Sequence, residues 1–230
     1  MNYAGYTASG SIADFMYKVY GWMAAGLTLT GVTAYYLFYN QALFATIFGT
    51  PFAAMGLMLV QIALVVSLVG MVNRMSMSTA TMIFLGYSIL TGVTLSSIFY
   101  VYTMQSIYLV FGISAGMFAT MALYGYVTKD DLTGVGSIAR MGLFGIIIAM
   151  IVNIFLKSAQ MDYVLSLVGV AVFTLLTAYD NQKIKQMGHV LIGQGEIANK
   201  ASLQAALMLY LDFINLFLFL LRIMGQRRRD

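Results

Sequence analysis

Long apolar runs separated by short polar intervals make up most of this chain. A helix needs about 20 mostly apolar residues to cross the hydrocarbon core of a bilayer. Seven runs meet that length, at roughly 19–38, 52–72, 79–101, 107–127, 138–156, 163–179 and 201–223. The intervals between the runs show no sign of a separate soluble domain. The pattern predicts a single membrane domain of seven transmembrane helices over residues 1–230.

The composition supports an all-α integral membrane protein. Hydrophobic residues make up 61 % of the chain and charged residues only 9 %, whereas a soluble domain has about 25 % charged residues. The mean hydropathy is +0.86. The chain has no cysteine, which excludes disulfides, iron–sulfur ligation and thiol catalysis. The net charge of +4 is small, and its basic residues lie beside apolar runs, which indicates contact with lipid headgroups and not nucleic-acid binding.

The distribution of lysine and arginine predicts the orientation. With seven spans, one side of the membrane holds Lys18, Arg74, Lys129, Arg140, Lys183, Lys185 and Lys200, and the other holds Lys157, Arg222, Arg227, Arg228 and Arg229. Without the basic tail, the bias places the N-terminus in the cytoplasm. In the alternative topology, the last hydrophobic segment re-enters the membrane and leaves the tail inside. We prefer seven full spans.

Small residues within the spans predict close helix packing. Gly112 and Gly116 form a G-x-x-x-G pair, and Gly142 and Gly145 lie close together in the fifth span. Such positions let two helices approach each other closely. The simplest interpretation of both pairs is helix packing without any further function.

Two aspartates stand out because charges are rare inside apolar runs. Asp212 lies in the middle of "LYLDFINLFLFLLR", and Asp180 ends the sixth span in "LLTAYDNQKIKQM". An ionised aspartate at the centre of a bilayer costs about 2.5–3.5 kcal/mol on insertion scales. On adjacent antiparallel helices the two carboxyl groups would share one depth. A pair at hydrogen-bond distance would then hold one shared proton and titrate as a unit.

Such a pair also attracts cations. Ca²⁺ prefers six to eight oxygen ligands, and two carboxylates are too few for a tight cage, so we expect a weak, passing site of the kind that conduction needs. The supporting polar side chains nearby are Tyr179, Asn181, Tyr210 and Asn215. Arg74 closes the second span on the same predicted face and could pair with the charged acids as a latch. The alternatives are that Asp180 only faces headgroups and that Arg74 only anchors its helix.

The same residues resemble a known family. The segments "LTAYDNQKIK" and "LYLDFINLFLFLLRI" look like the signature of the Bax inhibitor-1 family, the transmembrane BAX inhibitor motif proteins. "VYGWMAAGLTLTG" and "ILTGVTLSSIF" are similar to its first and third spans, and "LYGYVTKDDLTG" resembles bacterial members in particular. The resemblance covers nearly the whole chain.

The resemblance implies a seven-helix bundle with the seventh helix at its centre. It also implies a Ca²⁺ leak pathway in a bacterial inner membrane, gated by pH through two aspartates whose positions match Asp180 and Asp212. By spacing alone, Arg74 matches an arginine that latches the closed state. The longer stretch between Met187 and Lys200 departs from shorter relatives. Some bacterial members modulate a membrane-bound protease, so a non-conducting interaction protein is the alternative.

Enzymatic functions fit the chain poorly, and no cofactor is expected. An intramembrane aspartyl protease would need G-x-G-D where this chain has "LYLD", and its P-A-L motif is absent because the only proline is Pro51. A motif without its full context is weak evidence. A retinal-binding receptor would need a lysine in the seventh span, which has none. We therefore predict a protein that is not an enzyme, with Ca²⁺ and H⁺ as permeant or sensed ions.

Overall fold

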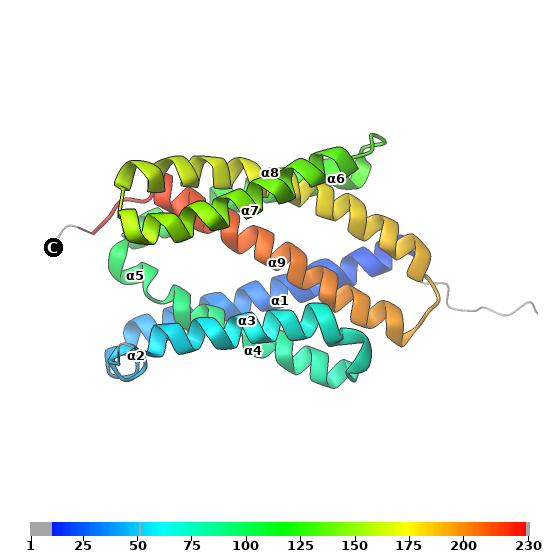
Figure 1. Cartoon of the computed structure of the whole chain (residues 1–230). Helices are drawn as coiled ribbons and strands as arrows, with labels where there is room; N and C mark the ends of the chain where they lie inside the picture. The colour runs from blue at the N-terminus through cyan, green and yellow to red at the C-terminus, as the bar shows by residue number, and fades with distance from the viewer. Residues whose placement is uncertain (1–10, 51, 229–230) are drawn as a thin grey trace, which may run out of the picture. The chain divides into compact units, whose positions relative to one another are not determined.

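The computed structural model describes residues 11–50 and 52–228, and the regular structure in this part of the chain is helical. The elements in order are α1 (Ile12–Tyr39), α2 (Gln41–Phe48), α3 (Ala53–Met71), the short 3₁₀ helix η1 (Val72–Arg74), α4 (Met77–Leu95), α5 (Ile98–Val101), α6 (Met104–Val127), α7 (Thr133–Leu156), α8 (Ala159–Leu191) and α9 (Glu196–Met224) (Figure 1). Pro51 and Arg229 lie outside the described residues.

The predicted all-α membrane fold is confirmed, although fewer helices than the seven predicted are apolar enough to be identified as spans. Within the described residues, six helical segments are long and apolar enough to cross a membrane, and they contain α3, α4, α6, α7, α8 and α9. The first predicted span coincides with α1, whose 28 residues give about 42 Å of helix. Its tyrosines, threonines and glycines make it less apolar than the other six. Helix α9 is the most buried of the six, as expected for the last span.

The predicted long loop between the last two spans was wrong. Helix α8 continues past Tyr179 to Leu191, and α9 begins at Glu196, so only a tight turn joins them. His189 therefore lies in the last turn of α8. The polar residues Asn181 and Gln182 are buried in the structure, which is why a scale based on apolarity ended the helix too early.

The chain divides into two compact units. The first contains residues up to Ser97 together with 184–207, and the second contains residues 98–183 together with those from Met208 onward. Helices α8 and α9 each contribute one part to each unit. The prediction of a single domain over residues 1–230 stays a prediction.

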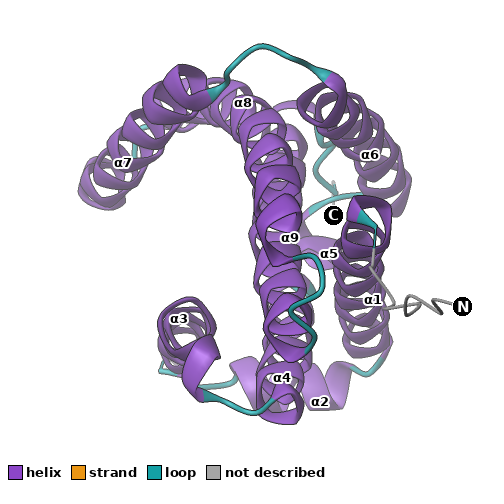
Figure 2. Cartoon of the chain, turned by 90° about the vertical axis from the view of Figure 1, so that its right-hand side faces the viewer, coloured by secondary structure: helices purple, strands orange, loops and turns teal. Residues whose placement is uncertain are grey.

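In the first unit, α4 lies between α1 and α3 (Figure 2). Glycine allows the close approach of α1 and α4, because a Cβ at Gly26 would lie 2.8 Å from the Phe84 ring. The Thr30 hydroxyl donates to the Ser88 carbonyl oxygen across the same contact at 2.9 Å. Helices α3 and α4 are linked by Gln61, whose amide donates to the Thr91 hydroxyl oxygen at 3.4 Å. Hydrogen bonds thus join apolar helix faces in this unit.

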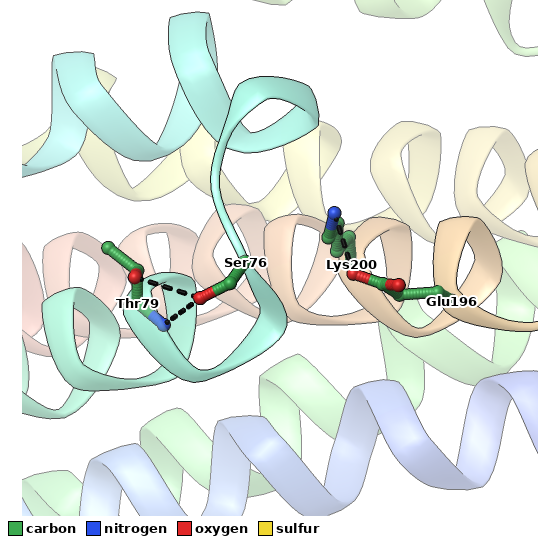
Figure 3. A network of polar contacts seen from close by, with 4 residues as sticks. All are labelled: Ser76, Thr79, Glu196 and Lys200. Atoms are coloured by element: carbon green, nitrogen blue, oxygen red, sulfur yellow. Dashed lines mark hydrogen bonds and ion pairs between the residues drawn. The ribbon is translucent and has the colours of Figure 1, made fainter.

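Helix starts in the first unit carry polar side chains that satisfy free backbone amides. At the start of α4, the Ser76 side chain accepts from the Thr79 amide at 3.1 Å, and the two hydroxyls are 2.9 Å apart (Figure 3). At the start of α9, Lys200 and Glu196 form an ion pair at 2.8 Å (Figure 3). Side-chain acceptors at N-caps and acidic residues in the first turn both stabilise a helix start.

In the second unit, α8 lies between α6 and α7 (Figure 2). A Cβ at Gly125 of α6 would overlap the Ala178 carbonyl of α8, and a Cβ at Gly136 of α7 would overlap the Tyr179 ring. Helix α9 packs on α6 through Phe213, whose ring is 5.3 Å from that of Phe111. Small residues and interlocking rings therefore hold this helix group together.

The glycine pairs singled out by the sequence are mostly not the ones that pack. Among the residues that the structure describes, a Cβ at Gly112, Gly116 or Gly145 would meet no atom within 4 Å, so these three glycines do not mark close helix contacts there. At Gly142 the packing interpretation holds, because a Cβ there would lie 2.8 Å from Val172. Spacing identifies small residues on one face, but the neighbouring helices decide which face is covered.

The end of the chain returns to the start of α6 within the second unit. After α9, the Thr103 amide donates to the Gln226 carbonyl and the Arg228 amide to the Val101 carbonyl, both at 3.0 Å. The Gln226 amide also donates to the Ser106 hydroxyl oxygen at 2.8 Å. Helix α9 is continuous from Glu196 to Met224, and the choice between a full span and a re-entrant last segment stays a prediction.

Candidate functional site: a buried aspartate pair

Asp180 of α8 and Asp212 of α9 come together within the second unit. Their carboxyl groups are hydrogen-bonded to each other. Asp180 is 9 % exposed and Asp212 is 5 % exposed. The structure therefore brings together the two acids that the sequence placed at a shared depth.

The surroundings of Asp212 are apolar. Its neighbours along α9, including Leu209, Phe213 and Leu216, are buried. Within the described residues, no hydrogen-bond donor reaches the buried Asp212 Oδ2 atom apart from the neighbouring Asp180 carboxyl group. A buried polar atom is costly unless a partner compensates it. The Asp180 carboxyl group is therefore the neighbour that can compensate the burial of Asp212.

Two cations act electrostatically on Asp180: Lys183 and Arg140. Arg140 of α7 donates from Nη1 to the Tyr179 hydroxyl oxygen at 2.8 Å and lies 4.9 Å from the centre of the Tyr179 ring. Tyr179 precedes Asp180, so this contact fixes the guanidinium beside the pair. Sequence reasoning missed Arg140, which it treated only as a topology signal. Its position inside the predicted span 138–156 was the signal that would have found it.

The loop between α6 and α7 is fastened to α8 two residues beyond Asp180. The Gln182 Oε1 atom accepts from the Leu132 amide at 2.9 Å, and its Nε2 donates to the Asp130 carbonyl at 2.7 Å. In this loop, hydrogen bonds from the Thr133 hydroxyl and amide lower the pKa of the Asp131 carboxyl. Asp131 thus stays charged at neutral pH.

Replacing Gln182 by leucine should free this loop. The change leaves the Leu132 amide and the Asp130 carbonyl without partners, at a cost of about 1–3 kcal/mol for each group that stays buried. We expect faster amide hydrogen exchange over residues 128–133. Gln186→Leu is the control, because Gln186 is exposed on the same helix. Equal protection in both variants would show that the Gln182 hydrogen bonds do not stabilise the loop.

Comparison with known proteins identifies the family. The family model described as "Inhibitor of apoptosis-promoting Bax1" matches residues 12–229. This chain belongs to the Bax inhibitor-1 family. An uncharacterized protein of Borreliella burgdorferi is 50 % identical over 94 % of this chain and 93 % of its own length. The inner membrane protein YbhL of Escherichia coli is 49 % identical over the same shares, and an uncharacterized protein of Rickettsia prowazekii is 43 % identical over 96 % and 93 %.

The supporting polar residues expected in this Bax inhibitor-1 family member have varied surroundings. The Asn181 amide donates to the Thr177 carbonyl at 2.6 Å, and the Asn215 amide to the Leu211 carbonyl at 2.8 Å. Both bonds run back along the residue's own helix. Tyr210 is fully buried, and the Tyr179 hydroxyl accepts from Arg140. The side-chain amide nitrogens of these two asparagines therefore bond to the backbone.

Arg74 lies in η1 of the first unit, where it is exposed. The aspartate pair lies in the second unit. The latch role expected for this arginine from the family resemblance therefore stays a prediction.

The aspartate pair is too small a ligand set to hold a metal ion tightly. Across residues 11–50 and 52–228, no three His, Asp or Glu side chains cluster closely enough to hold a metal ion. A tight Ca²⁺ site uses six to eight oxygens, several of them from carboxylates. Asp180 and Asp212 alone therefore do not form such a ligand set.

Proposed function

We propose that this Bax inhibitor-1 family protein is a pH-sensitive Ca²⁺ leak channel or slow transporter controlled by Asp180 and Asp212. The observation that carries the proposal is the hydrogen bond between these two buried carboxyl groups. Acidic groups within membrane helices are rare, and they commonly mark ion pathways or proton relays. The proposal is not enzymatic and requires no cofactor.

The pair can respond to pH because its hydrogen bond needs a proton. Ionised carboxylates only accept hydrogen bonds, so one of two bonded carboxyl groups must be protonated. When that proton leaves, two like charges face each other in apolar surroundings, which is unfavourable unless a cation lies beside them. Ca²⁺ binds carboxylate oxygens, and the pair offers such oxygens once its proton has left. Protons and Ca²⁺ therefore compete for the same atoms.

The two cations beside the aspartate pair favour the interpretation of the pair as a gate over that of a permanent Ca²⁺ site. Arg140 and Lys183 act on Asp180 and would hold an ionised pair when no metal is present. We propose Arg74 as a latch of the same kind, on the strength of the family resemblance. In this scheme, proton uptake removes the negative charge that holds the cations, and the pathway is released.

The proposed location is the bacterial inner membrane, with the N-terminus in the cytoplasm. The support is the name of the Escherichia coli relative, an inner membrane protein, together with the helices long enough to span. The orientation rests on the lysine and arginine bias between the spans.

Purified protein in liposomes tests the proposal. We expect liposomes with the wild-type protein and an internal Ca²⁺ indicator to pass Ca²⁺, with flux rising as the pH falls from about 8 to about 6. Empty liposomes are the control. No flux above the control at any pH in this range would contradict the proposal. The non-conducting partner of a membrane protease would then be the better hypothesis.

A further inference from the structure

A second polar feature lies within the second unit, where α7 meets α8 and the C-terminal segment returns. It is a cavity of about 640 Å³. Its polar lining includes Tyr102, Asn153, Lys157, Asp162, Arg222 and Arg227. None of these residues belongs to the aspartate site or to the hydrogen bonds between Gln182 and the α6–α7 loop. The cavity therefore requires its own explanation.

Three cations line this cavity and outnumber its carboxylate. Lys157, Arg222 and Arg227 face a lining with a single acid, Asp162. Within the described part of the chain, no salt bridge joins any of the three to a carboxylate. The Arg222 guanidinium lies 5.6 Å from the centre of the Phe219 ring, which orients it without neutralising it. The lining thus keeps an excess of positive charge.

The one acid of the cavity already has a partner. The Asn153 Nδ2 atom donates to Asp162 Oδ1 at 2.6 Å. The Asn153 Oδ1 atom accepts from the Ser158 amide at 3.0 Å, and Nδ2 also reaches the Ser158 carbonyl at 3.2 Å. Asn153 is 6 % exposed. This buried asparagine therefore holds the turn around Lys157, which adopts a left-handed backbone with φ of 50°.

We infer that this cavity binds a phosphate-bearing anion, with Lys157, Arg222 and Arg227 as its ligands. Guanidinium groups present forked donors that match phosphate oxygens, and lysine adds a compact charge. The antiparallel bridge between Tyr102 and Arg227 holds Arg227 beside the cavity. The site is independent of the proposed Ca²⁺ leak and uses none of its residues.

The phosphate has two possible sources, a phospholipid headgroup and a free phosphate ion. The cavity also borders apolar side chains that are exposed, with Ile154 at 68 % and Tyr163 at 54 %. Exposed apolar side chains on membrane helices contact acyl chains, and the phosphate of a lipid headgroup offers the same oxygens to arginine and lysine as a free phosphate ion does. The two sources share one recognition chemistry and differ in whether acyl chains contribute.

The test is a binding titration of the full-length protein in a neutral detergent. One arm uses inorganic phosphate, and the other uses short-chain phosphatidylglycerol, each followed by isothermal titration calorimetry. We expect Lys157→Gln and Arg222→Gln each to weaken binding about tenfold, as expected for loss of a charge-assisted contact. Lys129→Gln is the matched control, because Lys129 is an exposed lysine at the α6–α7 loop and should leave binding unchanged.

Both arms have decisive outcomes. Binding of the lipid alone identifies a headgroup site, and binding of phosphate with equal affinity identifies a free-anion site. Either result supports the inference if the Lys157→Gln and Arg222→Gln variants weaken that binding. Binding that is unchanged in both variants, or absent with both probes, overturns it. Circular dichroism and gel filtration check that each variant folds. If one variant does not fold, the other still tests the inference, because Lys157 and Arg222 lie on different elements.

Discussion

Asp212→Asn should abolish the pH dependence of Ca²⁺ flux in liposomes. Asparagine has nearly the same shape as aspartate and still forms hydrogen bonds, but it cannot exchange a proton in this range. The Asp180 carboxyl then has no second acid with which to share a proton, so the coupled titration is lost. We expect flux at about pH 6 and about pH 8 to agree within about twofold, because the coupled protonation step is gone.

Two further variants make this result specific. Asp180→Asn removes the other half of the pair and should give the same flat profile. Asp131→Asn removes a carboxylate of the α6–α7 loop that is exposed and bonded to Thr133, so it should keep the wild-type profile. A folded Asp212→Asn protein that still responds to pH as the wild type does would show that the pair is not the sensor. The flat profile in all three variants would indicate a general effect of surface charge.

Gly125→Ala should destabilise the helix group that holds the aspartates. The new Cβ would overlap the Ala178 carbonyl of α8, which is backbone and cannot rotate away. Forcing an extra carbon into a packed contact costs about 1–3 kcal/mol and can exceed the roughly 1 kcal/mol that alanine gains over glycine in a helix. Because Ala178 precedes Asp180 by two residues, the shift of α8 should also disturb the pair.

Gly112→Ala on the same helix is the matched comparison. A Cβ at Gly112 meets no atom of residues 11–50 and 52–228 within 4 Å, so only the gain in helix propensity remains and stability should be unchanged or rise by up to about 1 kcal/mol. The measurement is the midpoint of thermal unfolding in detergent, followed by circular dichroism. Opposite signs for the two variants are expected. A Gly125→Ala protein as stable as the Gly112→Ala protein would contradict the close contact between α6 and α8.

Local signals in the sequence were sufficient where hydrophobic length decides the outcome. The apolar runs predicted seven spans. Six of them coincide with helices that are long and apolar enough to cross a membrane, and the run 19–38 coincides with α1, whose tyrosines and threonines reduce its apolarity. The length of the apolar run failed to predict where α8 ends. There Gln182 is buried because it binds the backbone of a loop 50 residues earlier in the chain, and no local window contains that partner.

The site shows the same division. Asp212 was identified from the sequence because a carboxylate in a run of leucines and phenylalanines has no local compensation. Arg140 was missed because its importance comes from its contacts with Tyr179 and its field on Asp180. Arg74 was selected by family spacing, and its position in the first unit leaves its role open to test.

The sequence by itself determined that this is a helical membrane protein of the Bax inhibitor-1 family with two unusual acids, because span length and residue type are local properties. The tertiary structure alone decided that these acids share a hydrogen bond, that Arg140 lies beside them, and which glycines pack. Those facts depend on side chains from different helices meeting in space, and neither periodicity nor composition specifies which faces meet.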